Sequence, residues 1–273
     1  MYSKAEIIDR GIEAVKNDFD SGGTQIVHNA ITVVKAVLAN CPFKNQTNKI
    51  NAYLGKIASA KPSMPAMRNI VIYIQSILNT IEEPYDENFP FDSIISKIEI
   101  SSEEVVKQAV NEIFIKNGFR KILSCSLSST VFKIFLKASE VNIKFSVTAL
   151  ESVWNNKSYG LELMKKCHES NINCVAVKDT EIPSAVQESD CALVGADAII
   201  AVGGAVNGFP SLGLSHSCKN VIPFYIAAES FKFTKKYIVE DGFEYIPSDL
   251  ITKIITDEPA LWGEISCRFI SFR

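Results

Sequence analysis

The stretch CALVGADA, at residues 191–198, joins a short apolar run to a glycine turn and a single carboxylate. Four apolar residues without polar alternation are typical of a strand that is covered on both faces, as in a parallel sheet. Asp197 follows directly after this run. Because sites in α/β proteins form at the carboxyl ends of parallel strands, the stretch predicts a parallel sheet with a carboxylate at its functional edge.

Similar apolar runs recur from Arg120 onward, and consecutive runs lie roughly 20–30 residues apart, the length of a strand–helix–strand unit. We expect strands at residues 121–124, 144–149, 174–177, 191–194, 221–226 and 243–245. We expect helices between them, near residues 128–140, 158–170, 183–188, 211–219 and 248–256. This alternation predicts a Rossmann-like, doubly wound parallel sheet.

The first hundred residues carry helical periodicity instead, over residues 3–18, 26–38, from about 48 onward, and 66–81. The polar, proline-bearing stretch 82–90 is typical of a connection. After it, a long helix is expected to begin at Ser101 and to reach Lys116. The predicted fold class is α/β, with a helical N-terminal domain over residues 1–100 and a Rossmann-like domain over residues 101–273.

Composition narrows the function classes. The chain has 273 residues, of which 47% are hydrophobic and 22% charged, and its net charge is −3. A weakly acidic chain offers no general electrostatic attraction to nucleic acid or to a membrane surface. No apolar run approaches the roughly 20 residues that span a bilayer. The charged, helical N-terminus does not resemble a secretory signal, so we expect a soluble, cytoplasmic protein.

The cysteines and histidines argue against a metal or disulfide framework. There are seven cysteines with no CxxC pair, and the three histidines do not stand at ligand spacing from two cysteines. Most of the cysteines have apolar neighbours, as free thiols in a reducing compartment do. We therefore expect no structural metal and no cofactor.

Two strand ends carry polar side chains. Asp197 is a candidate acid or base, although its spacing alone favours a role in capping a turn or the next helix. Ser128 and Ser129 follow the strand at 121–124 and open a helix, where they either hold a phosphate or cap the helix. Cys125, beside them, is expected to have a lowered pKa if the helix N-terminus acts on its thiol.

Two further segments are weaker candidates. The loop GGAVNG, at residues 203–208, permits close approach to a phosphate, but it lacks a nucleotide-binding spacing and is also consistent with a plain tight turn. The end of the strand at 221–226 adds Glu229 as an acid and Lys232 as an anion partner. His28 and His216 fall within helical patterns and are expected to be packing residues.

Several of these segments, taken together, resemble one family. VGADAI (194–199), GAVN (204–207) and PFYIAAESFKF (223–233) closely resemble the alpha, beta and delta subunits of translation initiation factor 2B. The same superfamily contains methylthioribose-1-phosphate isomerase and ribose-1,5-bisphosphate isomerase. Five further segments occur in the same order as in this family, so the resemblance covers nearly the whole chain. They are KPS (61–63), AMRN (66–69), LES (150–152), PSDLI (247–251) and ITD (255–257).

The resemblance implies a pocket for a phosphorylated sugar or nucleotide between a helical and a Rossmann-like domain. With the residues selected above, the implied ligand-binding residues are Gly22, Gly23, Thr24, Lys61, Ser128, Ser129, Glu151, Asn207 and Lys232. In the isomerases of this superfamily, a cysteine after the first strand and the aspartate of Gly-Ala-Asp form an acid/base pair. Asp197 matches that aspartate.

The cysteine of that pair matches less well. Alignment on residues 122–124 places Ser126 at the thiol position and Cys125 one residue early, on the opposite face of an extended chain. A serine hydroxyl is a much poorer proton donor than a thiol near neutral pH. Val153 also stands where the isomerases usually have arginine. Two segments also carry fewer basic residues than their counterparts in the isomerases, namely DSGGT (20–24) and NGFP (207–210).

These differences from the isomerase pattern allow two hypotheses about function to be ranked. The first is an initiation factor 2B alpha-type regulatory subunit, or a related homologue, that binds a phosphorylated sugar or nucleotide as effector. It would self-associate as a dimer or higher oligomer, with paralogous subunits as further partners, and would contact the alpha subunit of initiation factor 2. The alternative is a sugar-phosphate aldose–ketose isomerase in which Asp197 works with Cys125 or Ser126. The departures favour the first.

Overall fold

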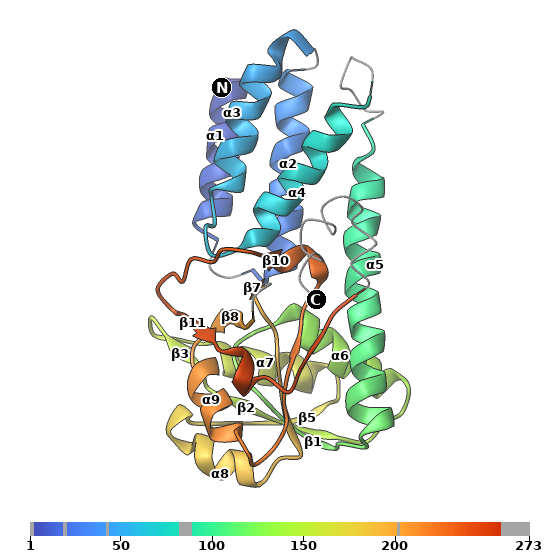
Figure 1. The fold of residues 1–273 in the computed structure, drawn as a ribbon, viewed down its shortest axis with the longest axis vertical. Helices are drawn as coiled ribbons and strands as arrows, with labels where there is room; N and C mark the ends of the chain where they lie inside the picture. Colours follow the sequence, from blue (N-terminus) through green and yellow to red (C-terminus); the bar gives the residue numbers. More distant parts are fainter. Residues whose placement is uncertain (1–2, 19–20, 42–43, 82–88, 201–202, 258–273) are drawn as a thin grey trace.

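The computed structural model describes residues 3–18, 21–41, 44–81, 89–200 and 203–257. Figure 1 shows a layer of helices stacked on an α/β layer, with one long helix, α5, running beside both. The helical elements of the first part of the chain are α1 (Lys4–Lys16), α2 (Gly23–Asn40), η1 (Lys44–Gln46), α3 (Thr47–Ala58), α4 (Pro65–Leu78), α5 (Phe91–Ala109) and the π-helical η2 (Val110–Lys116).

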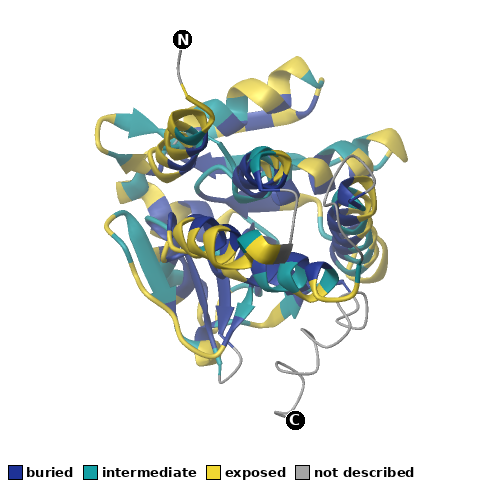
Figure 2. Ribbon diagram, turned by 90° about the horizontal axis from the view of Figure 1, so that it is seen from above, coloured by how far each residue is buried: buried dark blue, intermediate teal, exposed yellow. Residues whose placement is uncertain are grey.

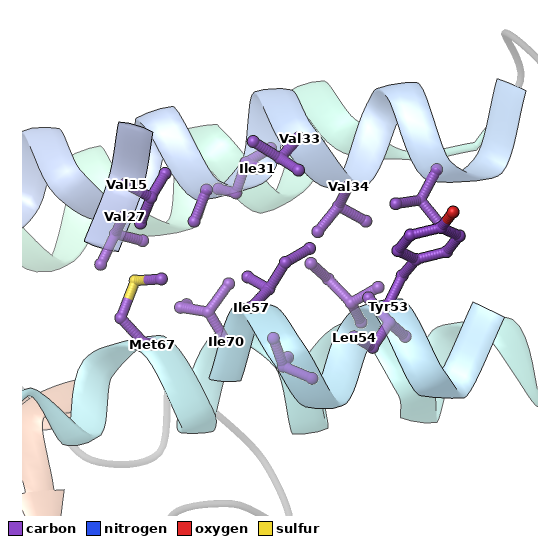
Figure 3. Packing of buried hydrophobic residues seen from close by; sticks show 14 of the residues in the cluster. Val15, Val27, Ile31, Val33, Val34, Tyr53, Leu54, Ile57, Met67 and Ile70 are labelled. Atoms are coloured by element: carbon purple, nitrogen blue, oxygen red, sulfur yellow. The ribbon is translucent and has the colours of Figure 1, made fainter. Parts of the chain in front are cut away.

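The helical layer is built from amphipathic helices. Ser3 and Glu6 form a capping box that begins α1, and Pro65 stands in the first turn of α4, where its missing N–H costs nothing. Each helix turns a buried stripe inward and an exposed stripe outward (Figure 2). The buried stripes meet in one apolar core, in which Ile57 and Ile70 face Val27 and Val34 (Figure 3).

The α/β layer contains the remaining elements. They are β1 (Lys121–Ser124), α6 (Ser129–Glu140), β2 (Ser146–Leu150), β3 (Val153–Trp154), β4 (Lys157–Ser158), α7 (Tyr159–Glu169), β5 (Asn173–Val177), η3 (Asp179–Glu181), α8 (Ile182–Gln187), β6 (Cys191–Val194), β7 (Ala198–Ile200), β8 (Ala205–Gly208), α9 (Ser211–Cys218), β9 (Phe224–Ala227), η4 (Ser230–Lys232), β10 (Phe233–Thr234), β11 (Phe243–Ile246), η5 (Ser248–Leu250) and β12 (Lys253–Ile255).

The main sheet confirms the predicted fold class. Its six strands are all parallel and lie in the order β12-β9-β6-β1-β2-β5. Numbered along the chain, this is the doubly wound order 3-2-1-4-5-6. The order reverses between β1 and β6, so the loops that leave these two strands diverge at the point where such sheets form their sites.

Apolar side chains cover both faces of this sheet, which explains the unbroken apolar runs in the sequence. Along β9, Tyr225 and Ala227 belong to the core beneath α5, α6 and α7, whereas Phe224 and Ile226 belong to the core beneath α8 and α9. Successive residues of a strand point to opposite faces, so a strand packed on both sides has no polar alternation.

A second sheet, in the order β10-β7-β8-β11, lies between the helical layer and the main sheet (Figure 1). It corrects two expectations. Residues 243–245 form β11, antiparallel to β8, and do not join the parallel sheet. The helix expected over residues 248–256 is wrong, because η5 is followed by β12, which pairs with β9. The spacing of the isoleucines in this stretch fits a helix or a strand, and pairing with β9 decides between them.

The long helix also differs from expectation. It begins at Phe91 and not at Ser101, and Ser101 and Ser102 are buried within it. Phe91, Ile94 and Ile98 belong to the core of the helical layer, whereas Val105 and Ala109 belong to the core of the α/β layer. The division at residues 100 and 101 stays a prediction, and α5 runs through it without a break.

Candidate functional site

The loops that leave β1 and β6 touch each other at the reversal of strand order. Beyond β1, the chain passes through Ser126 in the left-handed region (φ 62°) and enters α6 at Ser128. Beyond β6, it turns at Gly195, where a Cβ would lie only 2.4 Å from the Ser128 Oγ atom. Only glycine permits this approach, which brings the N-terminus of α6 beside Asp197.

The N-terminus of α2 reaches the same place from the helical layer. A Cβ on Gly22 would lie 3.1 Å from Ser129 Oγ, so the first turns of α2 and α6 abut. A Cβ on Gly23 would lie 3.9 Å from Asp197 Oδ1 and 4.0 Å from Lys232 Cε. The structure thus brings Gly22, Gly23, Ser128, Ser129, Asp197 and Lys232 together, although they come from distant parts of the sequence.

The two helix N-termini differ in how their N–H groups are satisfied. Ser128 caps α6, since its Oγ accepts the Val131 N–H at 3.3 Å. The capping reading of Ser128 is therefore correct as far as its own hydroxyl is concerned. Gly22 gives α2 no side-chain cap, and within the described residues the buried Thr24 Oγ1 has no hydrogen-bond partner. An uncapped helix N-terminus with a spare hydroxyl is suited to an anion.

Lys232 supplies the first cation. It is buried and its Nζ pairs with Glu229 Oε2 at 2.8 Å, while Thr130 donates to Glu229 Oε1 at 2.9 Å. Burial alone would raise the pKa of Glu229, but Lys232 and the hydrogen bonds from Lys232 and Thr130 outweigh it and lower that pKa. Glu229 is thus an ionised partner that holds Lys232 at the site, and its position does not favour proton transfer.

Asp197 is the carboxyl group of the site whose protonation state changes closest to neutral pH. Its side chain is half-buried, its N–H donates to the Val206 carbonyl at 2.8 Å, and burial raises its pKa to about 6. Lys232 and Lys61 act in the opposite direction and favour the carboxylate. A carboxyl group with this pKa can accept or donate a proton near neutral pH, or donate a hydrogen bond to a ligand.

Lys61 supplies the second cation, from the connection between α3 and α4. It is buried, and that burial lowers its pKa, while the carboxylates of Glu240, Asp18 and Asp197 act to raise it. The neighbouring Ser63 N–H donates to Glu240 Oε2 at 2.9 Å. Two buried lysines and two adjoining helix N-termini therefore surround one carboxyl group, an arrangement suited to a phosphorylated small molecule.

Cys125 lies outside this group of residues. It is fully buried, its Sγ is 3.2 Å from Ser211 Oγ, and burial raises its pKa to about 12. The lowered pKa expected from the helix N-terminus is therefore wrong, because the thiol points into the core beneath α8 and α9. Ser126 contacts other residues of the sheet edge. Its N–H donates to Ser152 Oγ at 2.7 Å, and its Oγ lies against Gly208.

The remaining candidates have structural contacts of their own. Asn207 is buried in β8, and its Nδ2 donates to Ser211 Oγ at 2.8 Å. The Glu151 carbonyl accepts from Ser158 Oγ at 2.8 Å, and the side chain is half-buried. A ligand-binding role for these two residues stays a prediction. Gly203 and Gly204, which directly precede β8, both adopt a positive φ (118° and 116°), a conformation that favours glycine.

Sequence reasoning missed two residues at this site. Glu240 gave no signal, because it stands in a charged loop of mixed composition. Asn69 stood within the quoted segment AMRN without a role. Its Nδ2 donates to the carbonyls of Phe231 and Phe233 at 2.7 and 2.9 Å, which fixes η4 and hence Lys232 against α4. A buried asparagine on an apolar helix face was the signal that could have found it.

The described residues also bear on metals, disulfides and membranes. Six cysteines lie within the described ranges, and all six are buried and free, whereas Cys267 lies outside those ranges. No cluster of histidine, cysteine and carboxylate side chains with the makings of a metal site occurs in the described part of the chain. None of the described helices has the length and apolar character that crossing a membrane requires.

Comparison with known proteins relates this site to a family. Residues 20–244 match the model of the Initiation factor 2 subunit family. An eIF-2B subunit 2-like protein of Pyrococcus furiosus is 29% identical over 182 residues, which are 66% of this chain and 63% of that protein. A ribose 1,5-bisphosphate isomerase of Methanocaldococcus jannaschii is 27% identical over 248 residues, which are 89% of this chain and 78% of that protein.

Solved structures agree with this relationship at the level of the fold. The Pyrococcus horikoshii translation initiation factor eIF-2B superposes with a TM-score of 0.78 and 21% identity, over 92% of this chain and 95% of that one. A subunit of the tetrameric eIF2B-beta2-delta2 complex from C. thermophilum gives 0.79 and 17%, over 98% and 96%. The family model covers the segments that build the site, from Gly22 to Lys232, and the chain therefore belongs to the Initiation factor 2 subunit family.

Proposed function

We propose that this chain is a regulatory subunit of the initiation factor 2B alpha type, and that it binds a phosphorylated sugar or nucleotide as an effector between its two layers. One observation carries the proposal. The uncapped N-terminus of α2 adjoins that of α6 beside Lys61, Lys232 and Asp197. The two helix N-termini and the lysines suit a phosphate, and Asp197 suits a sugar hydroxyl.

The chemistry of the site favours binding over turnover. Moving a proton between adjacent sugar carbons takes an acid and a base on opposite sides of the substrate. Asp197 can serve as one of them. In the described part of the chain no thiol accompanies it, because Cys125 is buried against Ser211 with a pKa of about 12. Ser126 would have to act through an ordinary hydroxyl.

An aldose–ketose isomerase is the second candidate. The ribose 1,5-bisphosphate isomerase from M. jannaschii aligns with more of this chain than the P. furiosus protein does. The pKa of Asp197, raised to about 6 by burial, suits proton transfer as well as it suits ligand binding. We rank this candidate second because the partner of Asp197 is missing.

Calorimetry and an activity assay separate the two candidates. We expect ribose 1,5-bisphosphate or AMP to bind the purified chain, and Lys232→Met to abolish binding, while Lys165→Met, at an exposed lysine of α7, leaves it unchanged. No ketose should form from ribose 1,5-bisphosphate. Turnover lost in both Asp197→Asn and Cys125→Ser would establish the isomerase instead. If neither ribose 1,5-bisphosphate nor AMP bound to the chain, the proposed effector site would be rejected.

The proposal extends to partners. We infer that the chain self-associates as a dimer or higher oligomer, alone or with paralogous subunits, and that it contacts the alpha subunit of initiation factor 2 in the cytoplasm. One structural neighbour comes from a tetrameric eIF2B-beta2-delta2 complex, which supports subunit assembly in this fold. Sedimentation at micromolar concentration should show a species of at least twice the 30.1 kDa chain mass. A purely monomeric species would exclude self-association.

A further inference from the structure

We call the loop between β10 and β11, residues 235–242, the strap. One of its side chains, that of Glu240, turns toward the protein and away from solvent. Residues 235–239 and Asp241 are exposed, whereas Glu240 is half-buried. The Glu240 Oε2 atom accepts the Ser63 N–H at 2.9 Å. This bond crosses from the α/β layer to the helical layer, so the strap is attached across the edge of the candidate site.

The same carboxylate acts on Lys61. Burial lowers the pKa of Lys61, and among the carboxylates that oppose this effect Glu240 is the strongest, ahead of Asp18 and Asp197. Ser63 is itself buried, and Lys61 precedes it by two residues. Glu240 is thus hydrogen-bonded to the Ser63 N–H and lies within electrostatic reach of the Lys61 ammonium, so a side chain of the protein already supplies an anion at these two groups.

The charge balance makes that occupant a competitor for an anionic ligand. Lys232 is paired with Glu229 at 2.8 Å, and both side chains are buried. Lys61 is the other buried lysine of the site, and the carboxylates of Glu240, Asp18 and Asp197 already act on it. A phosphate that entered beside Lys61 while Glu240 stayed would place two anions at one cation, in a poorly solvated place.

We propose that Glu240 is an internal occupant of the anion subsite made by the Ser63 N–H and Lys61, and that an anionic group of a ligand replaces it and releases the strap. This inference rests on the proposed function and adds a way for the bound ligand to change the protein surface. Both ends of the strap are held, because Arg68 donates to Thr234 and the Phe209 N–H donates to the Gly242 carbonyl.

Release would move an apolar part of the surface. Tyr237, Ile238 and Val239 are 42%, 55% and 42% exposed, and the Tyr237 ring stacks on Tyr245 with centroids 4.8 Å apart. Glu240 follows these residues directly, so its contact with Ser63 holds their backbone near the helical layer. The strap would then exchange between an attached state, in which Glu240 contacts Ser63, and a released state, in which a ligand is bound. The position of the apolar segment would change with ligand occupancy.

The first test is Glu240→Gln, which keeps the size and a carbonyl acceptor but removes the charge. The matched control is Asp241→Asn, which removes the same charge from the neighbouring exposed residue of the strap. By calorimetry, we expect ribose 1,5-bisphosphate to bind Glu240→Gln about threefold more tightly or better, since less of the site is blocked. We expect the control to match the wild type. Equal affinities in all three proteins would overturn the exchange.

The second test is limited trypsin digestion at Lys235 and Lys236, which are both exposed. Without ligand, cleavage should be faster in Glu240→Gln than in the wild type and in Asp241→Asn. Saturating ribose 1,5-bisphosphate should accelerate cleavage of the wild type. Slower or unchanged cleavage on addition of the ligand would overturn release of the strap.

The outcomes separate this inference from the proposed function. Binding to the wild type with no difference in Glu240→Gln would reject the exchange and leave the effector site standing. Absence of binding to the wild type would reject both. The thermal melt of each variant is expected to match that of the wild type, because the amide carbonyl in Glu240→Gln can still accept a hydrogen bond and Asp241 is exposed. Matching melts exclude unfolding as the cause of faster digestion.

Discussion

Asn69 on α4 donates from its amide nitrogen to the carbonyl of Phe231 at 2.7 Å, and the same nitrogen reaches the carbonyl of Phe233 at 2.9 Å. Phe231 belongs to the core of the helical layer, although it lies 162 positions beyond Asn69. One buried side chain thus ties the helical layer to the segment that carries Lys232. The site depends on this tie because Lys61 and Lys232 come from different layers.

Asn69→Ala should therefore lower the free energy of unfolding by about 1–3 kcal/mol, since two carbonyls lose their donor. It should also weaken binding of ribose 1,5-bisphosphate, because η4 is no longer fixed. Urea unfolding and calorimetry measure the two effects. Gln75→Ala, which removes an exposed hydrogen bond to Asn51 from the same helix, is the control and should change stability by about 0.5 kcal/mol or less. Equal effects would contradict the role of Asn69.

Gly195→Ala should destabilise the protein by about 1–3 kcal/mol, because the new methyl group would meet Ser128 Oγ at 2.4 Å. Adding Ser128→Gly should restore part of the loss, since a glycine N-cap leaves space and costs little. Thermal unfolding of the single and double variants measures this coupling. Gly55→Ala, in the last turn of α3 with no atom within 4 Å of the new carbon, should be neutral or stabilising. Additive effects of the two substitutions would contradict the contact.

Stability should depend on the ionisation of Asp197. Burial raises its pKa from 3.8 to about 6, so between these values the native state binds more protons than the unfolded state. Stability from this group is then present below about pH 4 and is lost as the pH rises to about 6. Asp197→Asn should be more stable than the wild type by roughly 3 kcal/mol at pH 8, and the two should converge near pH 4. Urea unfolding across this range measures the difference.

A matched control for the pH series is Asp241→Asn, which removes an exposed carboxylate of the strap and should leave the free energy of unfolding close to that of the wild type. If Asp197→Asn proved less stable than the wild type at pH 8, attraction between Asp197 and its two lysines would outweigh burial. That result would reverse the assignment of the pKa shift.

The six described thiols should resist alkylation in the native protein. All are buried, and burial raises the pKa of Cys125, Cys191 and Cys218, so the reactive thiolate is scarce. Treatment with iodoacetamide at pH 8, followed by peptide mapping, should label none of the six until denaturant is added. Labelling of Cys125 in the folded protein would place its sulfur at the site and would revive the isomerase hypothesis.

Strands buried on both faces were the most predictable part of the fold. Residues 121–124 and 191–194 form β1 and β6 as expected, because a short, unbroken apolar run is typical of a strand that is buried on both faces. The stretch 248–256 was misassigned because β12 forms by pairing with β9, a contact that the local sequence does not reveal. Likewise, the start of α5 was placed ten residues late. Ser101 and Ser102 suggested a helix start, and the structure buries both.

The candidate site was predictable where a strand end carries an unusual residue. Asp197 and Ser128 stand at the ends of β6 and β1, and the topology of a doubly wound sheet brings these ends together. The contacts with the helical layer were not predictable in this way. Nothing in the local sequence of the strap indicates that Glu240 reaches Ser63, since that contact depends on how the two layers are stacked.

The unbroken course of α5 has a consequence for dissecting this molecule. The helix contributes Ile94 to one apolar core and Val105 to the other, within about 17 Å of helix axis. A fragment that ended at residue 100 would leave the second half of α5 out of reach of α6, and the complementary fragment would begin inside a helix. Loosening either core removes the support that keeps α5 helical in the other, so both layers should melt in a single transition.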